Sequence, residues 1–259
     1  MSDRDFGALD GYPLLPRVLH EVASPDLRTA VLGSTLPSPM VPRLRRPGNA
    51  DAGVLAVMDA DVALDPNSRH AAAATVAVLG PSRMADLVPR TRALAELNVA
   101  AIGLDFSAMA DSEPFGQAPW RPRTREDLAE LRAAAGRPLW VFGLCDATDA
   151  EVAAEAGIDA VVLGCEVGRR VGAPAVIEVL PEVLDAVAGM VTVAVAGPVR
   201  DGIDVFRYLA VGAELVVVDG DRSLEALESE LAYAMRLTGC ASLADVGYDA
   251  VFAPLFGEP

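Results

Sequence analysis

Short runs of apolar residues alternate with longer segments that are apolar on one side only, and this alternation continues along most of the chain. The clearest runs read PLWVFG, IDAVVLG, VTVAVAG and ELVVVD. Runs that are apolar at nearly every position are typical of parallel strands buried on both faces. The pattern predicts eight strands, over Met40–Leu44, Ala60–Asp65, Ala74–Leu79, Val99–Asp105, Pro138–Gly143, Ile158–Gly164, Val191–Gly197 and Glu214–Asp219.

The segments between these runs have helical periodicity and recognisable first and last residues. TREDLAELRAAAG has Thr124 as its expected N-cap, acidic residues in the first turn, and Gly136 as its stop. DATDAEVAAEAG repeats this pattern, with Thr148 or Asp149 as the cap and Gly157 as the stop. Further helices are expected in PSRMADLVPRTRALAELN, VIEVLPEVLDAVAG, IDVFRYLAVGA and SLEALESELAYAMRLTG, whereas ALDPNSRHAAA is expected to hold a turn or a short helix.

Eight strands with intervening helices predict an α/β fold, a single-domain (β/α)8 TIM barrel over residues 1–259. Residues 1–38 form an N-terminal extension, whose PRVLHEVASPDLRTAVLGS stretch is placed to cap the barrel floor, and residues 223–259 form a C-terminal helix and tail. An open, doubly wound sheet is the alternative fold. No G-x-G-x-x-G follows the first strand, which disfavours that alternative.

The composition of the chain disfavours several classes of binding partner and of chemistry. The net charge of −16 argues against nucleic acid and anionic membranes. No apolar stretch approaches the roughly 20 residues that cross a bilayer, and no secretory signal pattern begins the chain, so a cytoplasmic location is expected. All basic residues are arginine, which excludes lysine Schiff-base chemistry. The three cysteines have no C-x-x-C spacing, so neither a disulfide framework nor a metal site is indicated.

The active site of a TIM barrel lies at the C-terminal ends of its strands, and charged residues occupy those positions here. Asp105 ends the fourth strand, and GCEVGRR after the sixth holds Cys165, Glu166, Arg169 and Arg170. Glu166 and Asp105 are candidate acid–base residues, and the two arginines are a candidate anion clamp. The alternative is that the arginines pair with Glu166 or with surface acids, that Cys165 is inert, and that Asp105 caps a helix.

Loops after strands seven and eight of such barrels often bind phosphate through backbone N–H groups and a helix N-terminus. The turns AGPVRDG and DGDRS supply Gly197, Arg200, Gly220 and Arg222 as anion-binding candidates. Pro198 has no N–H group, so one donor of such a cradle is missing. Arg43, Asp65 and Asp219 also end predicted strands.

Several longer stretches resemble the FMN-dependent α-hydroxy-acid oxidases and dehydrogenases, the family of lactate oxidase and glycolate oxidase. They are PRVLHEVASPDLRTAVLGSTLPSPM, GAPAVIEVLPEVLDAVAG, VRDGIDVFRYLAVGA and ELAYAMRLTGCASLADV. The resemblance implies a TIM barrel in which a histidine takes the substrate hydroxyl proton while a hydride passes to the flavin. It also implies arginines that hold the substrate carboxylate and a lysine that stabilises the reduced flavin.

The catalytic residues that the resemblance implies are replaced in this chain. Where the family has S-N-H-G-G-R-Q, this chain has GCEVGRR, so the histidine position falls on Glu166 in a gapped alignment and on Cys165 in an ungapped one. Arg169 matches the family's substrate-binding arginine in the gapped alignment only. The lysine position falls on Phe142.

The phosphate-binding residues implied by the resemblance differ as well. Pro198 replaces a glycine of the family's D-G-G-V-R, and the family's G-R pair falls on Asp219 and Gly220 or is displaced to Arg222. Neither Phe142 nor Pro198 reproduces a flavin contact of the family.

These replacements lead us to expect a barrel that has lost flavin and hydride transfer, because general-base catalysis alone contributes typically ~10²–10⁴-fold. We expect no cofactor, and acid–base chemistry on a small anionic metabolite, a carboxylate or a phosphate. One alternative is an FMN-dependent oxidoreductase of a 2-hydroxy acid with a rearranged site. Another is a non-catalytic paralogue that assembles with an active relative. A homo-oligomer is expected under all three hypotheses.

Overall fold

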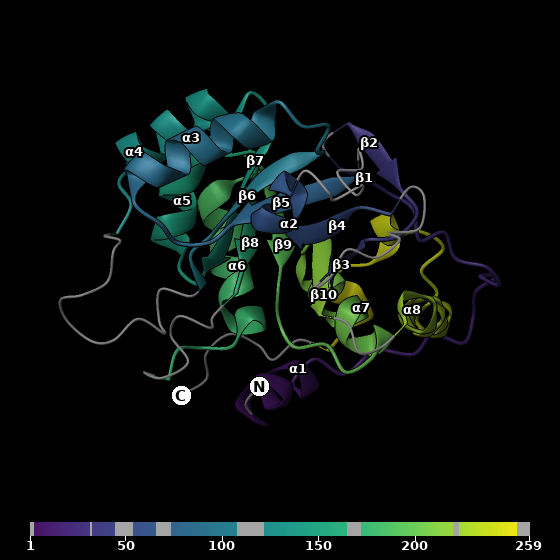
Figure 1. Cartoon of the computed structure of the whole chain (residues 1–259). Helices are drawn as coiled ribbons and strands as arrows, with labels where there is room; N and C mark the ends of the chain where they lie inside the picture. Colours follow the sequence, from purple (N-terminus) through teal and green to yellow (C-terminus); the bar gives the residue numbers. More distant parts are fainter. Residues whose placement is uncertain are drawn as a thin grey trace.

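The computed structural model describes residues 3–31, 33–44, 54–65, 74–107, 122–164, 172–219 and 223–252. Its eight parallel strands close into a barrel in the order β10-β3-β4-β5-β6-β7-β8-β9 (Figure 1). This closure confirms the predicted (β/α)8 TIM barrel and excludes the open sheet. The strands are β3 (Met40–Leu44), β4 (Ala56–Asp59), β5 (Thr75–Leu79), β6 (Ala101–Asp105), β7 (Leu139–Leu144), β8 (Ala160–Leu163), β9 (Thr192–Val195) and β10 (Leu215–Asp219).

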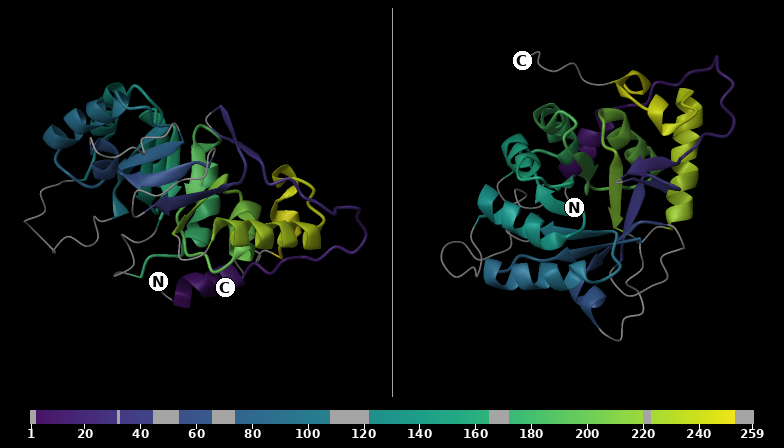
Figure 2. Two further views of the ribbon diagram at one scale, coloured as in Figure 1. Left: turned by 45° about the vertical axis from the view of Figure 1, so that its right-hand side comes forward. Right: turned by 90° about the horizontal axis from the view of Figure 1, so that it is seen from above.

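The helices lie on the outside of the strands, as the view from above in Figure 2 shows. They are α2 (Ala60–Leu64), α3 (Met84–Ala95), α4 (Arg125–Ala135), α5 (Ala147–Glu155), α6 (Val176–Val187), α7 (Gly202–Val211) and α8 (Leu224–Thr238), followed by the 3-10 turns η3 (Leu243–Asp245) and η4 (Tyr248–Ala250). Within the ranges described above, no helix combines the length and the apolar character that a membrane span requires.

Local capping sets the helix boundaries. Thr124 caps α4 with its side chain, and the helix ends at Gly136, whose φ of 56° is left-handed, so both predicted boundaries are confirmed. Asp146 caps α5, because its carboxylate accepts hydrogen bonds from the backbone N–H groups of Thr148 and Asp149. The predicted caps Thr148 and Asp149 are therefore wrong: an aspartate just before the helix reaches donors that lie in its first turn.

The second barrel strand lies earlier in the sequence than predicted. β4 ends at Asp59, whose side chain accepts a hydrogen bond from the Asp61 N–H and caps α2. The predicted strand Ala60–Asp65 is therefore wrong, and Asp65 is the C-cap of a short helix and not a strand end. A short apolar run cannot be assigned to strand or helix from periodicity alone, so the N-cap decides the assignment.

Part of the N-terminal extension lies at the floor of the barrel, and the capping role expected for the whole PRVLHEVASPDLRTAVLGS stretch stays a prediction. Its strands β1 (Thr29–Val31) and β2 (Ser34–Leu36) form an antiparallel hairpin that leads directly into β3. Val31 and Leu36 are buried in one cluster with Trp140 and Leu215, which point into the barrel. Leu215 begins β10 and Trp140 is the second residue of β7, so the hairpin lies at the N-terminal ends of the strands, opposite the end at which a site is expected. The extension begins with α1 (Asp3–Asp10), which lies away from the floor, beside the loops that follow β8 and β9: Arg4 donates a hydrogen bond to the Gly172 carbonyl, and Asp10 pairs with Arg200.

Candidate active site at the barrel mouth

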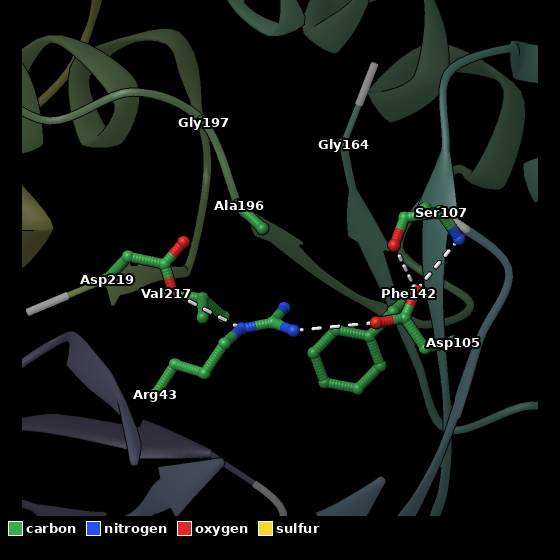
Figure 3. A pocket seen from close by; sticks show the side chains of 10 residues that line it. Arg43, Asp105, Ser107, Phe142, Gly164, Ala196, Gly197, Val217 and Asp219 are labelled. Atoms are coloured by element: carbon green, nitrogen blue, oxygen red, sulfur yellow. Dashed lines mark hydrogen bonds and ion pairs between the residues drawn. The ribbon is translucent and has the colours of Figure 1, made fainter. Parts of the chain in front are cut away.

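The C-terminal ends of the strands surround a cavity of about 480 Å³, which includes space open to solvent (Figure 3). This is the end of the barrel at which TIM-barrel enzymes carry their active sites. The residues that line the cavity come from strand ends and the loops after them: Arg43, Asp105, Ser107, Phe142, Gly143, Gly164, Ala196, Gly197, Val217 and Asp219.

Arg43 occupies the centre of this mouth. Its Nη1 lies 3.4 Å from Oδ2 of Asp105, and its Nε lies 3.4 Å from Oδ1 of Asp219 (Figure 3). Asp219 is the cross-strand neighbour of Arg43 in the register between β10 and β3. Asp105 ends β6, three strands further round the barrel. Arg43 therefore bridges two carboxylates from different sides of the mouth.

Asp105 is held firmly by the residue two positions after it. Both the backbone N–H, at 2.8 Å, and the hydroxyl of Ser107 donate to Asp105 Oδ1. The Asp105 side chain is only 15% exposed. Since Ser107 engages Oδ1, the remaining oxygen, Oδ2, is the one that faces Arg43. Asp105 thus accepts a backbone hydrogen bond as a capping residue does, and it also lines the cavity. Its two predicted roles, as a cap and as an acid–base residue, are therefore compatible.

Gly143 makes this arrangement of Ser107 possible. Its φ is 86°, and a Cβ atom at this position would lie 2.4 Å from the backbone nitrogen of Ser107. A side chain at position 143 would therefore push Ser107 away and loosen its hold on Asp105. Gly143, the glycine of PLWVFG, is therefore a part of the site, although the sequence predicted it only as the end of a strand.

Phe142 forms the floor of the cavity. The centre of its ring lies 5.8 Å from the Arg43 guanidinium carbon, within the range of a cation–π contact. On its other side the ring stacks on Trp140 at a centroid distance of 6.1 Å. Phe142 is 1% exposed. It therefore separates the mouth from the barrel interior and gives Arg43 an apolar support.

One donor of Arg43 is buried without a hydrogen-bond acceptor among the described residues. Nε is fully covered, yet the Asp219 oxygen at 3.4 Å does not meet it in hydrogen-bond geometry. An unsatisfied buried donor costs roughly 1–3 kcal/mol. The Arg43–Asp219 contact is therefore a loose ion pair, and the guanidinium has capacity for another acceptor.

Arg200, predicted to bind an anion, is engaged by carboxylates of the chain itself. Its guanidinium pairs with Asp204 at 2.8 Å and with Asp10 of α1 at 2.6 Å, and it stacks on Phe6 at 4.7 Å. The hydrogen bond from Arg200 lowers the pKa of Asp10, and the two carboxylates raise the pKa of Arg200. Anion binding by Arg200 stays a prediction, while the structure uses this side chain to attach α1 to α7.

The N-terminus of α7, predicted as part of a phosphate cradle, also receives carboxylates from within the chain. Asp201 accepts hydrogen bonds from two N–H groups of the first turn. Asp204 accepts one from the Arg200 N–H at 2.9 Å, and Glu230 of α8 accepts one from the Gly202 N–H at 2.9 Å. These donors are consequently occupied. Gly197 lines the cavity, and its anion-binding role stays a prediction.

The remaining predicted site residues lie outside the described part of the chain. They are Cys165, Glu166, Arg169, Arg170, Gly220 and Arg222. Their proposed roles stay predictions. Arg43 was noted in the sequence only as the end of a strand, and its place at the centre of the mouth was missed, because nothing local distinguishes it from the arginines that follow.

Residues 40–253 match the family model described as FMN-dependent dehydrogenase. The chain belongs to the FMN-dependent dehydrogenase family. The match includes all eight barrel strands, so the resemblance drawn from the sequence is confirmed.

Curated members of this family align with part of the chain. L-lactate oxidase of Lactobacillus jensenii is 36% identical over 135 residues, which are 46% of this chain and 33% of that protein. Peroxisomal (S)-2-hydroxy-acid oxidase GLO4 of Oryza sativa subsp. japonica is 37% identical over 150 residues, which are 52% of this chain and 41% of that protein. The aligned region thus spans well under half the length of these relatives.

Solved structures share the fold. A lactate oxidase of Pediococcus acidilactici superposes with a TM-score of 0.77 at 21% identity, covering 98% of this chain and 86% of that one. A mandelate oxidase variant with a C4a-OH-FMN adduct superposes with a TM-score of 0.75 at 21% identity, covering 96% and 89%.

The prediction that the protein has no cofactor is wrong by these comparisons. The family is described as FMN-dependent, and a structure with the same fold holds an FMN adduct. The absence of the histidine and the lysine that the resemblance implies led to the prediction that the cofactor is lost too. Binding of a large cofactor is distributed over many backbone and side-chain contacts, so the loss of two reactive groups does not by itself abolish it.

Within the described residues, such a group would lie in the cavity at the mouth, whose volume of about 480 Å³ includes space open to solvent. A Cβ atom on Gly164 would make ordinary van der Waals contacts, with the Ala196 carbonyl oxygen at 3.7 Å and with Gly143 Cα at 3.8 Å, so this glycine is a close-packed part of the cavity wall at the end of β8. The buried Nε of Arg43 supplies a donor that lacks an acceptor within the described ranges. A cavity with a cationic donor that lacks an acceptor suits either the FMN ring system or an anionic substrate, because both carry acceptor oxygens.

Proposed function

We propose that this protein is an FMN-dependent oxidoreductase that oxidises a small 2-hydroxy carboxylic acid at the barrel mouth. The observation that carries the proposal is the pairing of Arg43 with Asp105 beside an open cavity, in a chain of the FMN-dependent dehydrogenase family. The names of the aligned relatives, a lactate oxidase and a 2-hydroxy-acid oxidase, support this substrate class. The small anionic substrate expected from the sequence is retained.

FMN would be held at the mouth, against the wall that Gly164, Ala196 and Gly197 form, and the unsatisfied Nε of Arg43 would be left for the substrate. When bound, FMN supplies the acceptor for the hydride that leaves the substrate. The donors of the α7 N-terminus are occupied by Asp201, Asp204 and Glu230, so we do not assign the phosphate to that helix.

Arg43 would bind the substrate carboxylate, because a guanidinium presents donors in a fixed fork that matches a carboxylate. Asp105 would take the proton of the substrate hydroxyl on Oδ2, the oxygen that Ser107 does not engage. Ser107 would keep the carboxylate in place during this transfer. A base in this role must lie within hydrogen-bond reach of the proton that it removes.

The expected homo-oligomer, a hetero-assembly with an active relative, and the cytoplasmic location stay predictions. Each is compatible with an FMN enzyme, and none is needed for the chemistry at the mouth.

The proposal is tested by isolating the protein and measuring bound FMN after gel filtration. We expect one FMN per chain, either as isolated or after incubation with excess FMN. Glycolate, lactate and mandelate are then added without oxygen, and at least one should bleach the flavin absorbance. Absence of FMN under both conditions, or bound FMN that no 2-hydroxy acid bleaches, would overturn the proposal and favour a non-catalytic paralogue.

A further inference from the structure

The two carboxylates that flank Arg43 differ in how firmly they are held. Asp105 is 15% exposed and anchored by both donors of Ser107. The Asp219 side chain is 62% exposed, and within the described ranges its one polar contact is the 3.4 Å approach to Arg43 Nε. Asp105 is therefore a fixed partner of Arg43, and Asp219 is a replaceable one.

The loose contact leaves Arg43 poised to accept another anion. Its Nε is buried and lacks a hydrogen bond to any described residue, although Asp219 lies next to it. Ion pairs with one exposed partner contribute little because solvent screens them. A ligand carboxylate that meets Nε in better geometry can therefore replace Asp219 at small cost.

Because the site already carries two carboxylates, an anionic ligand is expected to bind Arg43 only when it takes the place of Asp219. Arg43 with Asp105 and Asp219 carries a formal charge of −1, so an incoming anion meets two carboxylates for a single guanidinium. Like charges a few ångströms apart repel even near a protein surface. We propose that Asp219 competes with the anionic group of the ligand for Arg43 and thereby sets how tightly the mouth binds mono- and dianions.

This inference rests on the proposed function in that it takes Arg43 as the carboxylate-binding residue. The inference adds Asp219 as a residue that weakens anion binding, and this gives a function to the aspartate at the end of β10. A dianion, with twice the repulsion from Asp219, should be penalised more than a monoanion.

The test measures binding of oxalate and of acetate to the purified protein by calorimetry, in the wild type, D219N and R43Q. We expect D219N to bind oxalate roughly two- to five-fold more tightly, the factor that corresponds to a weak ion pair. The gain should be smaller for acetate and should shrink at high salt. R43Q should lose at least ten-fold in oxalate affinity. D249N, which removes the exposed partner of Arg17 at a distant site, is the matched control and should match the wild type.

Unchanged or weaker oxalate binding in D219N would overturn the competition, and wild-type binding in R43Q would overturn the assignment of Arg43. If D219N folds poorly, Asp219→Ser also removes the carboxylate, and its oxalate affinity is measured instead. Oxalate binding requires no turnover. The effect of D219N on oxalate affinity can therefore be measured even if no 2-hydroxy acid bleaches the flavin absorbance. The two proposals therefore fail separately.

Discussion

Gly103 of β6 and the ring of Phe142 from β7 share one position inside the barrel. A Cβ atom on Gly103 would lie 2.8 Å from Cε2 of Phe142 and 2.7 Å from Cγ2 of Val78. The large ring fits beneath the mouth because the neighbouring strand has no side chain there. Phe142, at the position where the resemblance implies a lysine, is thus an integral part of the packed barrel and supports Arg43 from below.

Gly103→Ala should destabilise the fold by about 1–3 kcal/mol, because the added methyl group overpacks a site that cannot expand. The free energy of unfolding measured in urea is the test. Gly80→Ala is the control, since a Cβ atom at that position would meet no described atom within 4 Å, and it should change stability by less than about 0.5 kcal/mol. Equal effects of the two substitutions would contradict the packing argument.

Asp204 should be the most sensitive carboxylate of the α7 region. It is fully buried and pairs with both Arg200 and Arg207, each at 2.8 Å. Asp204→Ala removes the buried partner of two guanidiniums and should cost about 3–5 kcal/mol in the free energy of unfolding. Asp249→Ala breaks an exposed pair with Arg17 and should cost at most about 1 kcal/mol. A small loss in the first variant would show that Asp10 alone satisfies both arginines.

The attachment of α1 should weaken in acid. The hydrogen bond from Arg200 lowers the pKa of Asp10 below its ordinary value of 3.8. A carboxylate whose pKa is lower in the folded state stabilises that state fully above the unfolded pKa, and the contribution disappears as the pH falls through the folded pKa. The stability difference between wild type and Asp10→Asn should therefore be constant near neutral pH and shrink below about pH 4. Denaturation at a series of pH values measures it, and a difference that grows in acid would contradict the pairing.

Asp105→Asn should lower the rate of flavin reduction by 2-hydroxy acid about 10²–10⁴-fold, the usual contribution of a general base. The variant keeps the size of the side chain and an acceptor for Ser107, so FMN binding should be retained. Rapid-mixing measurements of flavin bleaching provide the rate. Asp61→Asn serves as the control, because Asp61 is an exposed partner of Arg90 outside the mouth. Equal rates in Asp105→Asn and the wild type would remove Asp105 from the reaction.

Patterns within short stretches of the sequence were sufficient to predict most of the strands and helices of the barrel. β3 begins and ends where the apolar pattern placed it, and α4 begins after Thr124 and ends at Gly136. Strands buried on both faces and helices with capping residues leave patterns within a few neighbouring residues. The segment Ala60–Asp65 was misassigned because a single short apolar run fits a strand and a helical turn equally well.

The sequence by itself determined the barrel, its family and the acidic and basic residues at its strand ends, since each of these is recorded in local pattern or motif. Only the tertiary structure decided which of those charges meet. Arg43 reaches Asp105, 62 positions away, because barrel closure brings β3 and β6 to one mouth. Arg200 pairs with Asp10 because the fold places the end of α1 beside the start of α7. Ion pairs form between residues that are close in space, and the positions of these arginines in the sequence do not show which carboxylates lie near them.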